Sequence, residues 1–242
     1  MESERFKKWI SYPTWRCPTC RQGTLKLDHK TVQTGLSRRE RSRLDDHEAN
    51  RAEITERFTA LMGCDFCKEV ATISGNRCEG HYGQEDGPDI SYEVLSIIPA
   101  PIVIAMGNKV PTESRARITE ASALLWVDPT AAASRLREAI EAVLTHQTIP
   151  THTAKGKKFN LHERIELFRK IGGGKWADQA NYIEAAKWLG NEGTHETITR
   201  EEALDTFAML EEVLDDLYVG ERLKLKAKVE ATLAKYQKPP KP

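Results

Sequence analysis

Neither charge is in excess in this chain, whose 242 residues carry 36 basic and 36 acidic side chains. This balance argues against a protein that coats nucleic acid non-specifically, although a local basic patch is compatible with it. No apolar run approaches the ~18 residues that a membrane span needs, and residues 1–13 lack the apolar core of a signal peptide. We therefore expect a cytoplasmic protein with no membrane contact.

Two catalytic signatures are also missing. The chain has no HExxH-like pair, and it offers no open set of histidine and carboxylate ligands of the kind that a zinc hydrolase requires. The glycine run at 172–174 follows a predicted helix and lacks the Gly-Lys-Ser/Thr ending of a phosphate-binding loop. Neither a zinc hydrolase nor a P-loop enzyme is predicted.

Four of the five cysteines stand in two CxxC pairs, Cys17/Cys20 and Cys64/Cys67. Two such turns can place four thiolates about 2.3 Å from one Zn²⁺ ion and close the tetrahedron without an open position. A closed site of this kind is structural and not catalytic. In a reducing compartment, metal ligation is favoured over a redox dithiol or a disulfide. The sequence predicts a structural zinc site with these four ligands.

A third ligand pair, Cys78 and His81, leaves an alternative open. Either residue could replace one of the four cysteines, or the pair could bind a second ion. Three pairs do not fill two tetrahedra, so the two CxxC pairs are kept as the ligands. The simpler interpretation of Cys78 is a free thiol in a loop.

The surroundings of the two pairs predict a zinc ribbon. Short strand candidates follow each pair, at residues 24–27 and 70–75. The gap between the pairs is longer than in most zinc ribbons, and we interpret the excess as a helical insert from about Ser37 to Met62. Its apolar row has helical spacing; the row comprises Ile54, Phe58, Leu61 and Met62. Four arginines at residues 38–43 could contact phosphate, but balanced charge in the insert favours a solvated helix.

The remaining sequence divides into a linker, a helical region and a tail. After a module at 1–82, residues 83–110 are rich in glycine and proline and predict a linker with one strand over Glu93–Ile104. Residues 111–236 follow the 3.6-residue period, and residues 237–242 are expected to be disordered. The helix starts are marked by Asp128-Pro129 and by capping boxes; the boxes are Asn160/Glu163 and Thr199/Glu202. The predicted fold is mainly α, a bundle of about five helices after a small zinc-ribbon module.

Three features together resemble a known family. They are the CxxC…CxxC start, the helix Leu136-Arg137-Glu138-Ala139-Ile140-Glu141, and the junction Leu189-Gly190-Asn191…His195. The chain resembles the bacterial domain-of-unknown-function family 4145, which is grouped with the HEPN helical bundles. The resemblance covers about Pro111 to Tyr218, and an N-terminal zinc ribbon is common among the members.

The resemblance implies a nucleic-acid-linked function in bacterial anti-phage defence. Many HEPN proteins are metal-independent endoribonucleases with an arginine, a following polar residue and a histidine four to six residues after the arginine. Asn191 and His195 match the last two, whereas Gly190 stands where the arginine would be. Lys187 or Arg137 could supply the missing cation. His195 would act as general acid or base on the 2′-OH of RNA, and Asn191 would orient the histidine or the phosphate.

The alternative is a non-catalytic zinc-ribbon and helical adaptor within a defence or restriction complex. Glycine cannot stabilise charge on a phosphate as arginine does, which favours the adaptor. HEPN active sites commonly form across a two-fold axis, so the resemblance implies a homodimer. RNA or another nucleic acid and partner proteins of a defence complex are the expected ligands.

Overall fold

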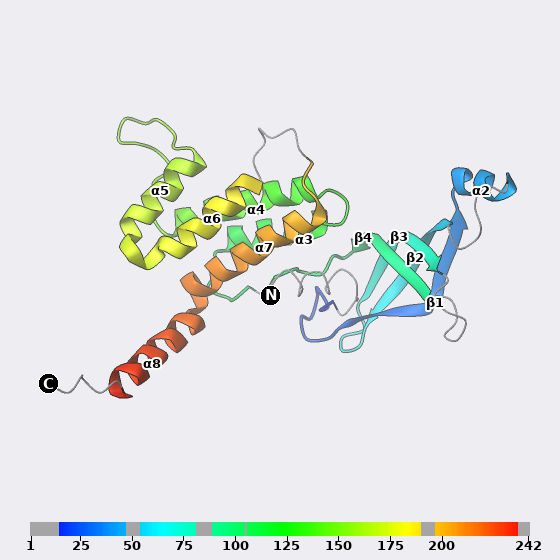
Figure 1. Ribbon diagram of the computed structural model, residues 1–242, viewed down its shortest axis with the longest axis horizontal. Helices are drawn as coiled ribbons and strands as arrows, with labels where there is room; N and C mark the ends of the chain where they lie inside the picture. Colours follow the sequence, from blue (N-terminus) through cyan, green and yellow to red (C-terminus); the bar gives the residue numbers. More distant parts are fainter. Residues whose placement is uncertain (1–14, 47–53, 81–88, 105, 190–196, 237–242) are drawn as a thin grey trace. The chain divides into compact units, whose positions relative to one another are not determined.

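The computed structural model describes residues 15–46, 54–80, 89–104, 106–189 and 197–236. They form two compact units. The first comprises residues 1–103 together with 122–132, and the second comprises residues 104–121 together with 133–242. The first unit contains the sheet and the second contains most of the helices (Figure 1).

The sheet has four antiparallel strands in the order β1-β2-β3-β4. The strands are β1 (Leu25–Leu36), β2 (Thr55–Cys64), β3 (Val70–Gly80) and β4 (Asp89–Ile98). Leu25 lies opposite Cys64, so β1 begins where β2 ends. The two CxxC turns immediately precede β1 and β3, and both therefore lie at this end of the strands. The predicted order of knuckle, strand, knuckle, strand is present, with two further strands.

One face of the sheet builds the core of the first unit. Phe58, Ala60, Met62 and Cys64 alternate along β2 and are at most 5% exposed. They pack with residues of the other strands and with Trp15 and Trp126. The two indole rings meet edge to face with centroids 5.0 Å apart, an arrangement that aromatic pairs prefer.

The predicted helical insert over residues 37–62 is wrong. Among the residues of this stretch that the structure describes, Arg38–Asp45 alone is helical (α2), with Ser37 as its N-cap, and Thr55–Cys64 is strand β2. The apolar residues in this stretch also fit a two-residue period, since Phe58, Ala60, Met62 and Cys64 share one face. Leu61, which the helical row required on the buried side, is 39% exposed on the other face. Pairing with both β1 and β3 decides between the two periods.

The single strand expected within the linker is the fourth strand of the sheet. β4 pairs with β3 from Asp89 to Ile98, earlier in the chain than the predicted span of Glu93–Ile104. With a four-stranded sheet in the first unit, the fold is mixed α and β, so the prediction of a mainly α fold is wrong for this part of the chain.

From Thr112 on, the described residues contain six α-helices, where the sequence predicted about five. They are α3 (Thr112–Leu124), α4 (Pro129–His146), α5 (Leu161–Gly172), α6 (Ala177–Leu189), α7 (Arg200–Leu214) and α8 (Glu221–Tyr236). A 3₁₀ turn, η2 (Gly173–Trp176), joins α5 to α6, and a π-helical turn, η3 (Asp215–Val219), follows α7. Apolar residues at helical spacing are buried: Leu136, Ile140 and Val143 of α4 are fully inaccessible.

Local signals fix most helix starts. Both predicted capping boxes are present, at Asn160/Glu163 and at Thr199/Glu202. The Asp128 carboxylate accepts from the N–H of Ala131 at 2.9 Å and caps α4. Within the described residues, no helix is both long enough and apolar enough to cross a membrane.

Candidate functional site

Four sulfur atoms converge at the end of the sheet where the two CxxC turns lie. The Sγ atoms of Cys17, Cys20, Cys64 and Cys67 all lie within 4.8 Å of one another. The Sγ–Sγ distances are 3.7 Å for Cys17–Cys67 and 3.8 Å for Cys20–Cys64. A regular tetrahedron with metal–sulfur bonds of about 2.3 Å has edges of about 3.8 Å. The predicted ligand set is thus assembled with the spacing that a tetrahedral ion needs.

The two turns have the same local conformation. Arg21 and Lys68, which follow the second cysteine of each pair, have left-handed φ angles of 58° and 65°. Their N–H groups donate to the carbonyl oxygens of Cys17 (3.0 Å) and Cys64 (3.2 Å). Each hydrogen bond therefore closes a turn of five residues that contains both cysteines of its pair. The left-handed residue costs about 1–2 kcal/mol when it is not glycine, a cost compatible with a turn that a ligand stabilises.

Hydrogen bonds join one turn to the other. The N–H of Thr24 donates to Asp65 Oδ1 at 2.8 Å, and the N–H of Asp65 donates to the carbonyl of Thr24 at 3.1 Å. The Thr19 hydroxyl donates to Glu69 Oε2 at 2.7 Å. The Thr24 N–H, followed by Lys26, holds the pKa of Asp65 below its usual value although burial opposes this. The protein itself thus aligns the two turns.

Gly23 allows the turns to approach. A Cβ atom at this position would lie 2.5 Å from Cys64 Sγ and 2.6 Å from Phe66 Cβ. Both distances are far below ordinary contact. The need for glycine at position 23 cannot be read from its neighbours in the sequence, because it arises from the second turn, which is distant in the sequence.

Two of the thiols have pKa values that are shifted in opposite directions. The N–H groups of Gly23 and Gln22 lower the pKa of Cys20 to about 6. The N–H of Glu69 alone would lower the pKa of Cys67, but burial and the other three thiols outweigh it and raise the pKa to about 12. Of these two thiols, Cys20 therefore gives up its proton more readily than Cys67. An ion that binds all four thiolates must displace protons, so its affinity depends on pH.

Cys78 lies outside this cluster. It is a residue of β3, and its Sγ lies 3.5 Å from Thr55 Oγ1. The group of potential ligands in this part of the described chain comprises the four CxxC cysteines and does not include Cys78. Its proposed partner His81 lies outside the described residues.

The solvent-facing side of the sheet carries a groove of about 670 Å³. Its lining mixes hydroxyl and amide side chains with apolar ones; the lining residues are Thr31, Gln33, Thr59, Ala60, Leu61, Thr72, Ile73, Ser74, Ser96 and Ile98. No titratable side chain is among them. This surface can form many hydrogen bonds but holds no general acid or base.

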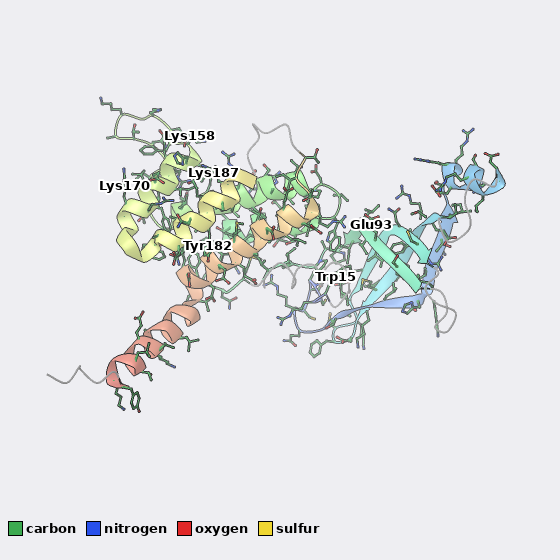
Figure 2. All side chains as sticks on the ribbon, in the orientation of Figure 1. Trp15, Glu93, Lys158, Lys170, Tyr182 and Lys187 are labelled. Atoms are coloured by element: carbon green, nitrogen blue, oxygen red, sulfur yellow. The ribbon has the colours of Figure 1, made fainter. Side chains whose placement is uncertain are left out.

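In the second unit, Lys187 belongs to a charged cluster between α5 and α6 (Figure 2). Its Nζ lies 2.5 Å from Glu184 Oε1 and 3.4 Å from His162 Nδ1. Burial alone would raise the pKa of Glu184, but Lys187 and then His162 hold it below its usual value. The ligand atoms of His162, Glu166 and Glu184 lie within 4.8 Å of one another and could hold a metal. The Lys187 ammonium competes for the same oxygens, so the arrangement is an ion-pair network.

Arg137, another predicted site residue, lies on a different helix from the residues of this charged cluster. Arg137 is half-buried on α4. A different arginine, Arg164 on α5, is 4% exposed and donates to Thr145 Oγ1 at 2.8 Å and to the carbonyls of Glu141 and Ile149. Burial lowers the pKa of Arg164. It holds the end of α4 against α5, a structural role.

The junction with the proposed nuclease residues, Gly190, Asn191 and His195, lies outside the described residues. The structure therefore brings together the predicted metal ligands, and it places Lys187 and Arg137 on their helices. His162 and Glu184 were not predicted, because only the packing of α5 on α6 brings them to Lys187.

Two family models match the chain. Residues 119–238 match the domain of unknown function DUF4145, and residues 5–95 match the domain of unknown function DUF8608. The helical region is therefore a DUF4145 domain, as the sequence predicted. The second match covers both CxxC turns and most of the sheet. Comparison with curated proteins and with solved structures gives no match.

Proposed function

We propose that this chain is a nucleic-acid-linked adaptor: a β unit held together by structural zinc presents a binding surface, and the DUF4145 domain provides assembly contacts. The observation that carries the proposal is the groove with hydroxyl and amide side chains on the sheet that the four-cysteine site anchors. A second function, RNA cleavage, is kept below because one further observation favours it.

Zinc is the ion that fits the cysteine site best. Four thiolates at tetrahedral spacing form its usual structural site, and no ligand position remains open for substrate. The zinc ribbon that we infer for this unit has its knuckles at one edge of the sheet, so the ion fixes where β1 and β3 begin. Its role is to hold the sheet and not to act in chemistry.

The groove supports binding without catalysis. Threonine, serine and glutamine side chains are among those that contact phosphate and sugar in nucleic-acid complexes. Its lining has no titratable group, and a hydroxyl without a base is a weak nucleophile. A nucleic-acid backbone that lies across the sheet would find hydrogen-bond partners there, and no group to cleave it.

The experiment combines binding and cleavage. Labelled single-stranded RNA is titrated with the full chain, and binding is measured by fluorescence anisotropy at several salt concentrations. Thr59→Asp places a negative charge in the groove and is expected to weaken binding roughly tenfold. Thr34→Asp, on the same sheet but outside the groove, is the matched control and is expected to bind like wild type. Equal binding by both variants, or no binding by wild type, refutes the proposal that the groove binds nucleic acid.

The second candidate is a HEPN-type endoribonuclease. The observation that favours it is the cluster of His162, Glu184 and Lys187 at the end of α6, directly before the junction with Asn191 and His195. Lys187 could then take the place of the missing arginine. RNA is incubated with wild type and with His195→Ala in the presence of EDTA. Cleavage that is lost only in His195→Ala supports the enzyme, and intact RNA with both proteins supports the adaptor.

A defence setting is proposed from the family resemblance. The homodimer and partner proteins of a defence complex are proposed on the same ground. We also propose a cytoplasmic location, in which reduced thiols remain available for zinc.

A further inference from the structure

Helix α8 has a row of large apolar side chains that its own unit leaves exposed. Leu225, Val229 and Leu233 are 63%, 50% and 53% exposed, and Tyr236 is 72% exposed. Their spacing of three or four residues places them on one face of the helix. Of the twelve large hydrophobic side chains that are exposed in the described part of the chain, five lie from Val219 to Tyr236. Such clustering indicates an interaction surface.

The row is not covered by the preceding helix. Gly220 alone separates η3 from α8, with a left-handed φ of 69°. Its N–H donates to the carbonyl of Asp215, and its own carbonyl accepts from the N–H of Lys224 at 3.0 Å. Figure 1 shows α8 extending away from the end of α7. An antiparallel return needs a loop of about 2–5 residues, so α8 cannot fold back on α7 of its own chain.

The charges of the two consecutive segments are opposite. Residues 200–219 contain seven acidic residues and one basic residue, whereas residues 221–236 contain five basic residues and two acidic ones. On α8, Lys224, Lys228 and Lys235 are exposed beside the apolar row. Two α8 helices facing each other would bring lysine against lysine. An acidic helix is the better complement.

The outer side of α7 is acidic and could receive the basic helix α8. Glu201 and Asp205 are exposed on it, and Ala208 and Met209, further along the same side, are half-buried and offer apolar contact. Helix α7 continues into η3 without a break, and the two together are longer than α8. Because the rise per residue is nearly the same throughout a helix, the receiving segment is long enough for the whole arm.

We propose that α8 is a docking arm for a second copy of this chain, in which it lies along the acidic outer side of α7 and η3. Two-fold symmetry makes the exchange reciprocal, so that each copy both gives and receives an arm. The inference extends the proposed homodimer by naming its surface. It stands or falls independently of RNA binding and of cleavage, because neither the groove nor His195 takes part.

The first test is the oligomeric state of the full chain by sedimentation equilibrium over a concentration series. Wild type is expected to dimerise, and Leu225→Asp is expected to raise the dimer dissociation constant at least roughly tenfold. Ile171→Asp, which alters an equally exposed side chain on α5, is the matched control and is expected to dimerise like wild type. A monomeric wild type, or a Leu225→Asp variant that dimerises normally, overturns the proposal.

The second test identifies the receiving surface by charge exchange. One variant carries Lys224→Glu and Lys228→Glu, and the other carries Glu201→Lys and Asp205→Lys. Each alone is expected to be monomeric, because its arm and its receiving side have the same charge. In an equimolar mixture both contacts pair opposite charges, since the acidic arm meets the basic α7 and the basic arm meets the acidic α7, so dimers are expected to recover. A mixture that stays monomeric, or an α7 variant that dimerises alone, shows that α8 does not dock on α7.

Discussion

Replacing Gly23 by alanine is the sharpest test of the cysteine site, because a single methyl group would occupy space that the second turn already fills. The new Cβ would lie 2.5 Å from Cys64 Sγ, 2.6 Å from Phe66 Cβ and 2.8 Å from Asp65 Oδ1. Carbon atoms normally approach to about 3.5–4.0 Å, so the second turn would have to retreat by about 1 Å. Rotation of a long side chain cannot relieve two of these three contacts. Phe66 Cβ is bonded to the backbone, and Cys64 Sγ is bonded directly to its own Cβ.

A displacement of the second turn by about 1 Å is large for a metal site. Ligand distances in such sites hold to about 0.2 Å, so we expect Cys64 to leave the coordination sphere. Structural zinc contributes about 10–16 kcal/mol of apparent folding free energy in small zinc domains, and the loss of one ligand removes a large part of it. The strain of overpacking itself adds about 1–3 kcal/mol. The first unit should therefore bind zinc far more weakly and unfold at lower temperature.

The measurement is zinc content by elemental analysis, together with thermal unfolding of the metal-loaded protein. Gly63→Ala is the control, because Gly63 adjoins Cys64 and an added Cβ there meets nothing within 4 Å. We expect the control to bind zinc like wild type. If Gly23→Ala retains one zinc per chain with wild-type affinity, the two turns do not form a common site and the ligand assignment is wrong.

Three further outcomes are expected. Cys17→Ser should lower zinc content and destabilise the first unit, and an unchanged zinc content would contradict the assignment of Cys17 as a ligand. Asn160→Ala removes the capping box of α5 and should lower the free energy of unfolding by about 1 kcal/mol in urea titrations; a loss near zero would mean that the cap is not formed in solution. The Thr199 N–H and hydroxyl hold the pKa of Glu202 below its ordinary value of 4.5, so this stabilisation is present above the ordinary value and is lost as the pH falls through the folded value. The stability difference between wild type and Glu202→Gln should therefore shrink in acid, and a difference independent of pH would show that the pKa is not lowered.

Where structure depends on neighbouring residues in the chain, the sequence was a reliable guide. A CxxC pair sets its own turn, and a side chain at an N-cap reaches its own helix three residues on. For this reason the four cysteines, both capping boxes and the buried rows of α4 and α7 could be predicted from the sequence. The basic character of α8 could be predicted in the same way. The DUF4145 match of residues 119–238 supports the same region.

Residues 54–64 show where such reasoning failed. The apolar residues there satisfy a helical period and a strand period at once, so periodicity alone could not decide. The hydrogen bonds that β2 forms with β1 and β3 decided it, and these partners are distant in sequence. The strand over residues 89–98 was likewise expected as an isolated segment, because its pairing with β3 cannot be deduced from local composition.

The sequence by itself determined which residues could bind a metal, where most helices begin, and that α8 is basic. The tertiary structure decided how close these groups lie: that Gly23 must lack a side chain, that Lys187 faces Glu184 and His162, and that the row from Leu225 to Tyr236 is left exposed. The physical reason is the range of the forces involved. Turns, caps and helical faces arise from contacts within a few residues, whereas sulfur spacing, ion pairs between helices and exposed apolar surface depend on segments that only folding brings together.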